Sequence, residues 1–287
     1  MQFEGLNAFL RDGKPLLARG PVAVIFDEDG VALDETIAHA LEIGFRHAFV
    51  VSPFGPVLAD EPNVHLIAHD FRIEGFQISL NALIGAAPPK TWIFSCFNAE
   101  FLWYPFLESR LVGELCTFQS EERRSAFFGM VIDAYGAIDW ASPTAVNRDE
   151  TWFDAAGYYA LARHDPVHPL NTLDRQIDLY GGLRWRLEQL LPWDRRRIDR
   201  IPLFQAQPGL EMLPDHTLND AEMNTVSCPW HHNLTLAIIS FRAAKALKTN
   251  ATTRDLVGDL RYDGSVRFEW NSEQLLRLGM LDPGQWF

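Results

Sequence analysis

Short, uninterrupted apolar runs alternate with amphipathic stretches along the first part of the chain. Four of these runs have the length and composition of strands that are buried on both faces of a sheet. They lie at residues 21–26, 48–51, 65–68 and 91–94. Between them, residues 34–44 and 76–87 place apolar side chains at helical spacing, with Asp34 as the predicted N-cap and Gly44 as the predicted end of the first helix. This order is typical of a doubly wound α/β fold, so we predict a mixed, mostly parallel sheet flanked by helices.

The second half of the chain has a less regular pattern. Residues 127–135 and 201–204 predict further strands, and residues 111–118 predict an apolar segment near a sheet edge. Residues 139–180 are rich in turn signals and predict a long excursion over the functional site. Residues 230–247 have an amphipathic helical pattern, and a further helix is expected in the remaining C-terminal segment.

These patterns predict three parts of the chain. Residues 1–20 form a leader, residues 21–229 form one α/β domain, and residues 230–287 form a C-terminal helical extension that packs on the same domain.

The composition excludes several classes of protein. The formal net charge is −13, which argues against a nucleic-acid-binding surface because such a surface needs clustered Lys and Arg. The one basic cluster lies around Arg195–Arg197, and it either meets a phosphate or lipid head group or forms a solvated face. No apolar run reaches the roughly 18 residues of a membrane helix, so peripheral contact is the only membrane association expected. Three scattered cysteines and an N-terminus without signal-peptide character predict a cytoplasmic protein.

Acidic residues follow two of the predicted strands. Asp27, Glu28 and Asp29 come directly after the first strand, at the edge of the sheet where open α/β proteins bind ligands. They either contact the base or ribose of a nucleotide or form a solvated turn. Glu100 follows the strand at Thr91 and is surrounded by aromatic residues in the sequence. Burial there would raise the pKa of the carboxyl group and suit a general base, and a surface glutamate on a turn is the alternative.

Several short motifs follow one another in a fixed order along residues 20–250. They are the strand, acidic turn and helix over 21–45, Val131–Tyr135, the Phe-Asp-x-x-Gly-Tyr segment over Trp152–Tyr158, Gly181–Arg186, Arg200–Leu203, and the His-bearing segments Pro214–His216 and Trp230–His232. This order resembles the family-two glycosyltransferases with the GT-A fold. It is most similar to a bacterial branch of that family whose acceptor is unknown.

The resemblance implies a transferase of the hexosyltransferase type. Such an enzyme moves a sugar from a nucleotide-sugar donor to a saccharide or lipid-linked acceptor of the cell envelope, as part of polysaccharide biosynthesis. A Mn²⁺ or Mg²⁺ ion usually bridges the diphosphate to an Asp-x-Asp motif, because a hard cation neutralises the charge of the leaving diphosphate. The resemblance therefore implies a donor site, a catalytic carboxylate and, in its usual form, a metal.

The motifs assign these roles to individual residues. The implied donor-binding residues are Phe26, Asp27, Glu28, Asp29, Asn98, Gly181, Gly182 and Arg184. The implied catalytic residues are Glu100 and Asp154, although Asp154 also fits an Asx turn. His216 and His232 are candidate metal ligands, and packing or hydrogen bonding is the alternative role for each.

Two positions depart from the family pattern. The Asp-x-Asp motif falls on Phe97-Asn98-Ala99, so both carboxylates are replaced and the usual Mg²⁺ or Mn²⁺ site is absent or rebuilt. The second strand ends in Ser52-Pro53-Phe54-Gly55, where the family has an acidic residue that holds the nucleoside.

Three explanations stay open. The enzyme is metal-independent, with Arg184, Arg186 or Arg195–Arg197 in place of the cation. Alternatively, the site is rebuilt from Asp27, Asp29, Glu100, His216 and His232. In the third, catalysis is lost and the chain is a non-catalytic saccharide- or protein-binding protein on a glycosyltransferase scaffold.

Overall fold

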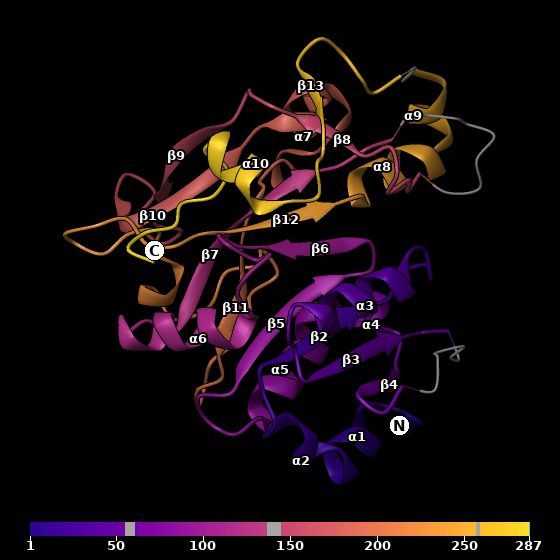
Figure 1. Ribbon diagram of the computed structural model, residues 1–287, viewed down its shortest axis with the longest axis vertical. Helices are drawn as coiled ribbons and strands as arrows, with labels where there is room; N and C mark the ends of the chain where they lie inside the picture. Colours follow the sequence, from indigo (N-terminus) through magenta and orange to yellow (C-terminus); the bar gives the residue numbers. More distant parts are fainter. Residues whose placement is uncertain (55–60, 137–144, 257–258, 287) are drawn as a thin grey trace. The chain divides into compact units, whose positions relative to one another are not determined.

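The four apolar runs at the start of the chain form neighbouring parallel strands. The computed structural model describes residues 1–54, 61–136, 145–256 and 259–286. The runs are strands β2 (Val22–Phe26), β3 (His47–Ser52), β4 (Val64–Ala68) and β5 (Trp92–Phe97). β2 pairs in parallel with β3 on one side and with β5 on the other, and β3 pairs in parallel with β4 (Figure 1). Consecutive side chains of β2 and β3 are all buried, so both faces of the sheet are covered, as in an α/β protein.

The fold class predicted from the sequence is confirmed at this level. The chain has an α/β structure with a large, mostly parallel central sheet that is flanked by helices. It divides into two compact units, which are described separately below. Unit 1 comprises Met1–Phe101, Ser109–Phe128 and Arg200–Asn224, and unit 2 comprises Leu102–Glu108, Gly129–Asp199 and Thr225–Phe287. The domain boundaries expected after residues 20 and 229 stay predictions.

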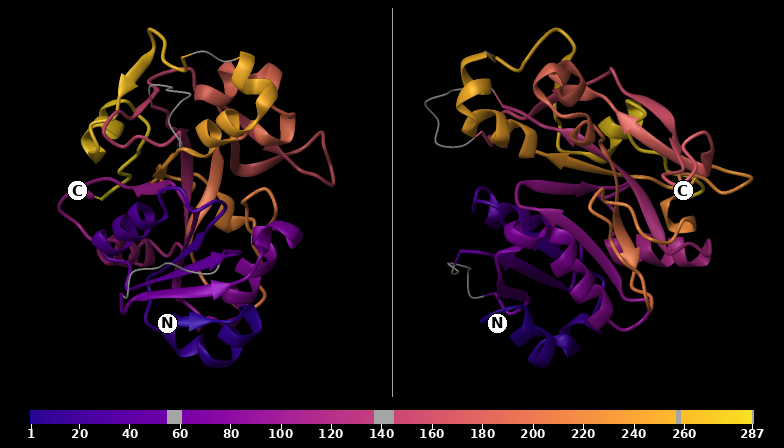
Figure 2. Two further views of the ribbon diagram at one scale, coloured as in Figure 1. Left: turned by 90° about the vertical axis from the view of Figure 1, so that its right-hand side faces the viewer. Right: turned by 180° about the vertical axis from the view of Figure 1, so that it is seen from behind.

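Unit 1 is built around six strands in the order β1-β4-β3-β2-β5-β11. Its further elements are β1 (Gln2–Phe3), α1 (Leu6–Asp12), α2 (Lys14–Leu17), α3 (Leu33–Glu42), α4 (Phe71–Glu74), α5 (Phe76–Ala86), α6 (Val112–Glu121), β11 (Asp199–Gln205) and the 3-10 helix η3 (Glu222–Asn224). β11 runs antiparallel to β5. Residues 1–20, expected as a leader, contribute β1 to this sheet, in parallel with β4, and fold against it at the N-terminal end of the chain (Figure 2). Their side chains Phe9 and Leu17 are completely buried.

Two local predictions in unit 1 are wrong. The N-cap of α3 is Ala32, with a φ of 53°, and Asp34 lies in the first turn of the helix. Of residues 111–118, expected as an apolar segment near a sheet edge, Leu111 is the N-cap of helix α6 and the others belong to the helix. Its buried residues Val112, Leu115, Cys116 and Gln119 recur at helical spacing, which the shorter window of apolar residues did not reveal.

Unit 2 contains the strands and helices of the second half of the chain. Its elements are β6 (Glu100–Trp103), β7 (Ala126–Asp133), β8 (Trp152–Asp154), β9 (Tyr159–His164), β10 (Thr172–Tyr180), α7 (Gly182–Arg186), β12 (Leu236–Ser240), α8 (Arg242–Thr249), α9 (Ala251–Leu256), β13 (Ser265–Arg267), α10 (Ser272–Arg277) and the 3-10 helices η1 (Glu188–Leu190) and η2 (Trp193–Arg195). β6 and β7 begin in unit 1, and β11 begins in unit 2. β12 pairs in parallel with β7, β9 pairs with β10, and β8 pairs with β13.

Two predictions in unit 2 also need correction. The helix expected over 230–247 is a strand, β12, followed by helix α8, so the C-terminal segment is not purely helical. The run Leu236–Ser240 is completely buried beside β7, and a short apolar run of this kind fits a buried strand as well as a helix. Residues 145–180 of the expected turn-rich excursion contain β8, β9 and β10, while residues 139–144 lie outside the described residues.

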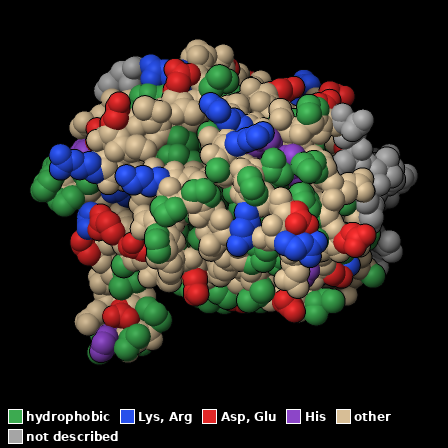
Figure 3. Space-filling model, turned by 90° about the horizontal axis from the view of Figure 1, so that it is seen from below, with side chains coloured by type: hydrophobic (Ala, Val, Ile, Leu, Met, Phe, Trp, Pro, Cys, Tyr) green, Lys and Arg blue, Asp and Glu red, His purple; other side chains and the backbone are tan. Residues whose placement is uncertain are grey.

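The distribution of charge on the surface and the length of the helices limit the partners that the protein could bind. On the face shown in Figure 3, basic and acidic side chains lie in many separate spots, and the basic ones form no continuous patch. Among the described residues, none of the helices has the length and apolar character needed to cross a bilayer.

Candidate functional site

The strand order of unit 1 creates a switch point between β2 and β5. From β2 the chain proceeds through β3 and β4 to one side, and it then returns to place β5 on the opposite side of β2. In open α/β sheets, ligands bind outside the carboxyl ends of the strands at this kind of position. Asp27 follows β2, Ser52 ends β3, and Asn98 follows β5. The sheet therefore brings three polar side chains to the edge where binding is expected.

These side chains form one hydrogen-bonded group, which we call the switch-point cluster and define as Asp27, Asp29, Ser52 and Asn98. Ser52 Oγ donates to Asp27 Oδ2 over 2.8 Å, and the Gly30 N–H donates to Asp27 Oδ1 over 2.7 Å. Asn98 Nδ2 donates to Asp29 Oδ1 over 2.6 Å. Asp27, Ser52 and Asn98 are buried, while Asp29 and Gly30 are exposed.

The Asn98 side chain fixes the loop after β2. Its amide oxygen accepts the Glu28 N–H over 2.8 Å, and its amide nitrogen also donates to the Val31 carbonyl over 2.8 Å. Because Asn98 is fully buried and uses both ends of its amide, it holds the acidic turn in one conformation. Exposed Asp29 and half-buried Glu28 are then presented at the surface of this turn. Carboxylates in this position can accept hydrogen bonds from hydroxyl groups of a ligand.

Glu100 is buried and ion-paired. Arg200 Nη1 donates to both Glu100 oxygens over 2.9 Å, and the Phe97 N–H donates to Oε2 over 2.9 Å. The side chains of Glu100 and Arg200 are 0% and 6% exposed, so the surface alternative for this glutamate is wrong. The guanidinium of Arg200 supplies a positive counter-charge to this buried carboxyl group.

Aromatic packing occupies the position of the expected metal motif. Phe97 is 5% exposed and contacts the rings of Phe26, Phe71 and Phe76 at centroid distances of 5.8, 6.3 and 5.5 Å. His216, a predicted metal ligand, stacks on Phe76 with ring centroids 4.5 Å apart. The side chain that replaces the first carboxylate of the family motif therefore belongs to an apolar cluster.

The histidines expected to bind a metal belong to different units, His216 to unit 1 and His232 to unit 2. Among the residues that the structure describes, no three His, Cys, Asp or Glu side chains lie close enough together to form a metal site. His232 belongs to unit 2, where its side chain is 83% exposed and lies 3.9 Å from Asp282. The described donor set therefore does not fit a divalent cation in the way the family motif does.

One cation of unit 1 lies near the switch-point cluster. Arg72 on α4 pairs with Asp70 over 2.8 Å, and its guanidinium lies 5.1 Å from the centre of the Phe54 ring. Hydrogen bonding to Asp70 raises the pKa of Arg72, and the negative charge of Asp27 raises it further. Sequence reasoning missed Arg72 because the influence of Asp27 on its charge depends on the order of the strands in the sheet.

In unit 2, the second predicted catalytic carboxylate is also enclosed by its neighbours. Asp154 is 1% exposed, and Arg186 donates to both of its oxygens over 2.7 and 2.9 Å. Tyr135 also donates its hydroxyl to Asp154 Oδ1 and lies 2.8 Å from the Ser265 hydroxyl. Burial, followed by the bond to Asp154, raises the pKa of Tyr135 well above its usual value. The Asx-turn role considered for Asp154 is replaced by this buried ion pair.

The predicted donor-binding arginine and glycines make internal contacts in unit 2. Arg184 pairs with the buried Asp133 over 2.8 Å. A Cβ on Gly181 would lie 2.6 Å from the Gly157 carbonyl oxygen, and one on Gly182 would lie 2.9 Å from the Tyr158 hydroxyl. Both glycines are therefore required for packing against the chain itself.

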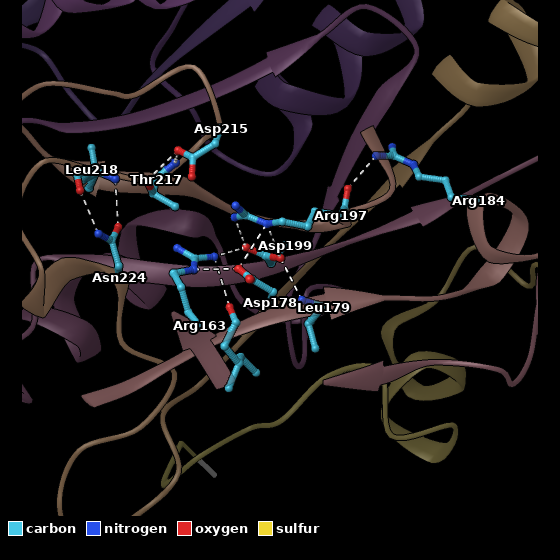
Figure 4. A network of polar contacts seen from close by, with 11 residues as sticks. Arg163, Asp178, Leu179, Arg184, Arg197, Asp199, Asp215, Thr217, Leu218 and Asn224 are labelled. Carbon is cyan, nitrogen blue, oxygen red and sulfur yellow. Dashed lines mark hydrogen bonds and ion pairs between the residues drawn. The ribbon is translucent and has the colours of Figure 1, made fainter. Parts of the chain in front are cut away.

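The basic cluster is partly neutralised within unit 2. Arg197 pairs with Asp199 over 2.6 Å and with Asp178 over 3.2 Å. Arg163 pairs with the same two carboxylates, over 2.7 Å for Asp178 (Figure 4). Arg196 pairs with Glu188 over 3.3 Å. Arg163 and Arg197 thus neutralise Asp178 and the buried Asp199. Much of the basic cluster therefore has a structural role in ion pairs.

No protein-family model and no curated protein matches this chain.

Proposed function

We propose that the chain is a glycosyltransferase that binds a nucleotide-sugar donor at the switch-point cluster and transfers the sugar to a saccharide or lipid-linked acceptor. The observation that carries the proposal is the meeting of Asp27, Ser52 and Asn98 at the carboxyl ends of β2, β3 and β5. The topology of unit 1 supports a ligand at this position. The order of the sequence motifs supports a nucleotide sugar as that ligand.

The acidic turn supplies acceptors for the donor's hydroxyl groups. Asn98 and Asp27 hold the turn through buried hydrogen bonds, so Glu28 and Asp29 are positioned before a ligand arrives. Such pre-organisation lowers the entropic cost of binding. In this proposal the ribose of the nucleotide donates its hydroxyls to these carboxylates.

A guanidinium serves as counter-charge to the diphosphate. Phe97 and Ala99 cannot coordinate a metal, so the negative charge that develops on the leaving nucleoside diphosphate needs another partner. In unit 1, Arg72 is the candidate, because its side chain is 46% exposed and the negative charge of Asp27 raises its pKa. Its present partner Asp70 is 34% exposed, and an exposed ion pair of this kind exchanges partners at little cost.

A second candidate function is non-catalytic binding of a nucleotide sugar. The observation that favours it is that both predicted catalytic carboxylates, Glu100 and Asp154, are buried in ion pairs with arginine. A general base must reach the proton of the acceptor hydroxyl, and neither carboxylate is exposed for that contact. In this second function, the protein would bind the nucleotide sugar and would not transfer the sugar.

The test is a donor panel with two separate readouts. The first readout is binding of UDP-, GDP- and dTDP-sugars, measured by calorimetry with and without Mn²⁺. The second is hydrolysis or transfer of the sugar, measured by release of the nucleoside diphosphate. Binding with turnover supports the transferase, and binding without turnover supports the second candidate.

Variants separate the donor site from the rest of the fold. Asp29→Asn and Arg72→Gln are expected to weaken donor binding by about tenfold each, because each removes a charge-assisted contact. Asp12→Asn and Arg11→Gln are matched controls, since these two side chains pair with each other on an exposed helix end. If no nucleotide sugar binds to the wild-type protein under any condition, both candidates fail.

A further inference from the structure

A pocket that the proposed function does not use lies at the amino-terminal ends of the unit 1 strands. Its volume is about 700 Å³, and it lies where β2, β3 and β5 begin. The segments that precede these strands line it together with residues of α6. The switch-point cluster lies beyond the carboxyl ends of the same strands, so the two sites are separated by the full length of the strands.

Two cations line this pocket. Arg46 precedes β3 and Lys90 precedes β5, and both residues are exposed. Within the described part of the chain, neither side chain has a hydrogen bond or an ion pair. The protein has 38 acidic and 25 basic residues, so most cations have acidic neighbours available. Two cations without a carboxylate partner at one pocket therefore indicate a site for an external anion.

The backbone at Lys90 gives an independent indication. Lys90 has a φ of 70°, in the left-handed region that favours glycine. Its N–H donates to the Ala206 carbonyl over 2.8 Å, and the Thr91 N–H donates to Pro88 over 3.1 Å, so the turn is held in place. A lysine in this conformation costs on the order of 1 kcal/mol compared with glycine. The hydrogen-bonded turn holds the backbone of Lys90 in one conformation at the pocket.

Positively charged side chains outnumber negatively charged ones among the residues that line the pocket. The pKa of buried His47, the first residue of β3, is lowered by burial and then by the charges of Arg19 and Arg46. The pocket lining contains a single carboxylate, that of the exposed Glu121 on α6. The two lining cations therefore exceed the lining anions by one charge.

Hydroxyl groups complete the lining. Thr91, Thr117 and Ser120 all line the pocket. Thr117 and Ser120 donate their hydroxyls to carbonyl groups of α6, over 2.8 Å in each case. Thr91 Oγ1 has no hydrogen-bond partner in the described ranges, so its hydroxyl can donate to a ligand.

We propose that this pocket binds the phosphate group of a small phosphorylated molecule, with Arg46 and Lys90 as counter-charges and Thr91 as a hydroxyl donor. Guanidinium and ammonium groups together with a hydroxyl are the usual partners of phosphate oxygens. A volume of about 700 Å³ leaves room for a ligand larger than phosphate alone.

The test is calorimetric titration of the full chain with inorganic phosphate and with ribose 5-phosphate, at an ionic strength held constant with sodium chloride. Both probes are expected to bind saturably, with Arg46→Gln and Lys90→Gln each weakening the affinity about tenfold or more. Tighter binding of ribose 5-phosphate identifies a phosphorylated molecule as the ligand, and tighter binding of inorganic phosphate identifies the free anion.

Three further variants make the test specific. Glu121→Gln removes the one lining carboxylate and is expected to tighten phosphate binding about threefold. Lys90→Gly is expected to abolish most of the binding and to leave the melting temperature unchanged or higher, because glycine relieves the strained backbone. Lys14→Gln removes an exposed lysine of unit 1 outside the pocket and is expected to bind phosphate like the wild type.

The proposal is overturned by either of two results. One is the absence of saturable binding of both probes to the wild-type protein. The other is equal affinity in the wild type and in the Arg46→Gln/Lys90→Gln double variant. Asp29→Asn changes an exposed carboxylate of the proposed donor site. It is expected to leave phosphate binding unchanged, which separates this test from the test of the proposed function.

Discussion

Breaking the Glu100–Arg200 pair is expected to destabilise unit 1 strongly. Both side chains are almost completely buried, and the guanidinium contacts both carboxylate oxygens over 2.9 Å. Arg200→Met would leave a buried carboxylate without its counter-charge, and Glu100→Gln would leave a buried guanidinium in the same state. Each single variant is expected to lose about 3–5 kcal/mol of the free energy of unfolding, the usual cost of breaking a buried ion pair.

The double variant measures the interaction energy between Glu100 and Arg200. Glu100→Gln/Arg200→Met has no buried charge, and the glutamine can still accept the Phe97 N–H. Its remaining cost is an unsatisfied amide group, about 1–2 kcal/mol. Since the two single costs add to at least about 6 kcal/mol, a double-mutant cycle is expected to give a coupling energy of about 4 kcal/mol or more. Urea denaturation at pH 7, followed by circular dichroism, measures all four proteins.

The control for this cycle is the exposed Arg11–Asp12 pair, whose side chains are 71% and 56% exposed. Arg11→Met is expected to leave the free energy of unfolding unchanged. Single variants at Glu100 and Arg200 that cost less than about 1 kcal/mol, or a double variant whose cost is the sum of the singles, would refute the reasoning. The double variant also separates stability from chemistry. Retained donor turnover makes Glu100 structural, whereas lost turnover in a folded protein makes it catalytic.

Three other predictions follow from buried groups. Burial, followed by nearby positive groups, lowers the pKa of His65 to about 4 from 6.5, and Nε2 of this ring lies 2.8 Å from Nδ1 of His47. Below about pH 6.5 the folded state then binds fewer protons than the unfolded state. The free energy of unfolding therefore has its full value above about pH 6.5 and falls by up to about 3 kcal/mol towards pH 4. His65→Gln is expected to flatten this pH dependence in urea titrations. Gly181→Ala is expected to cost about 2–4 kcal/mol in urea unfolding, because the new Cβ meets the Gly157 backbone, whereas Gly209→Ala, with open space around it, costs only about 1 kcal/mol. Asp154→Asn is expected to lose about 3–5 kcal/mol by leaving its arginine partner unpaired, and unchanged thermal and urea stability would contradict this.

The parallel strands were predictable because their sequence signal is local and strong. Val22–Phe26 and Trp92–Phe97 are short, apolar and bounded by turn residues, and a strand buried on both faces produces that pattern. By contrast, the sequence predicts a helix at Leu236–Ser240, because the apolar residues before and after this run match helical spacing. Only its pairing with β7, a contact distant in sequence, decides in favour of a strand.

The candidate site was predictable only in part. Asp27 and Asn98 were identified because polar residues that follow buried strands stand out in the sequence. Their hydrogen bonds to the same turn depend on the order of β2 and β5, which periodicity does not determine. Glu100 and Arg200 are 100 positions apart in the sequence, so no local pattern predicts that this glutamate forms an ion pair.

The most direct test of the proposed donor site is hydrogen–deuterium exchange with and without a nucleotide sugar. The proposed site predicts that a saturating donor slows exchange at the amides of Glu28, Gly30 and Val31 and at those of Asn98 and Ala99. The same donor should leave the amides of α10 unchanged. Binding of the donor without any change in exchange over residues 27–31 and 97–99 would contradict the placement of the donor at the switch-point cluster.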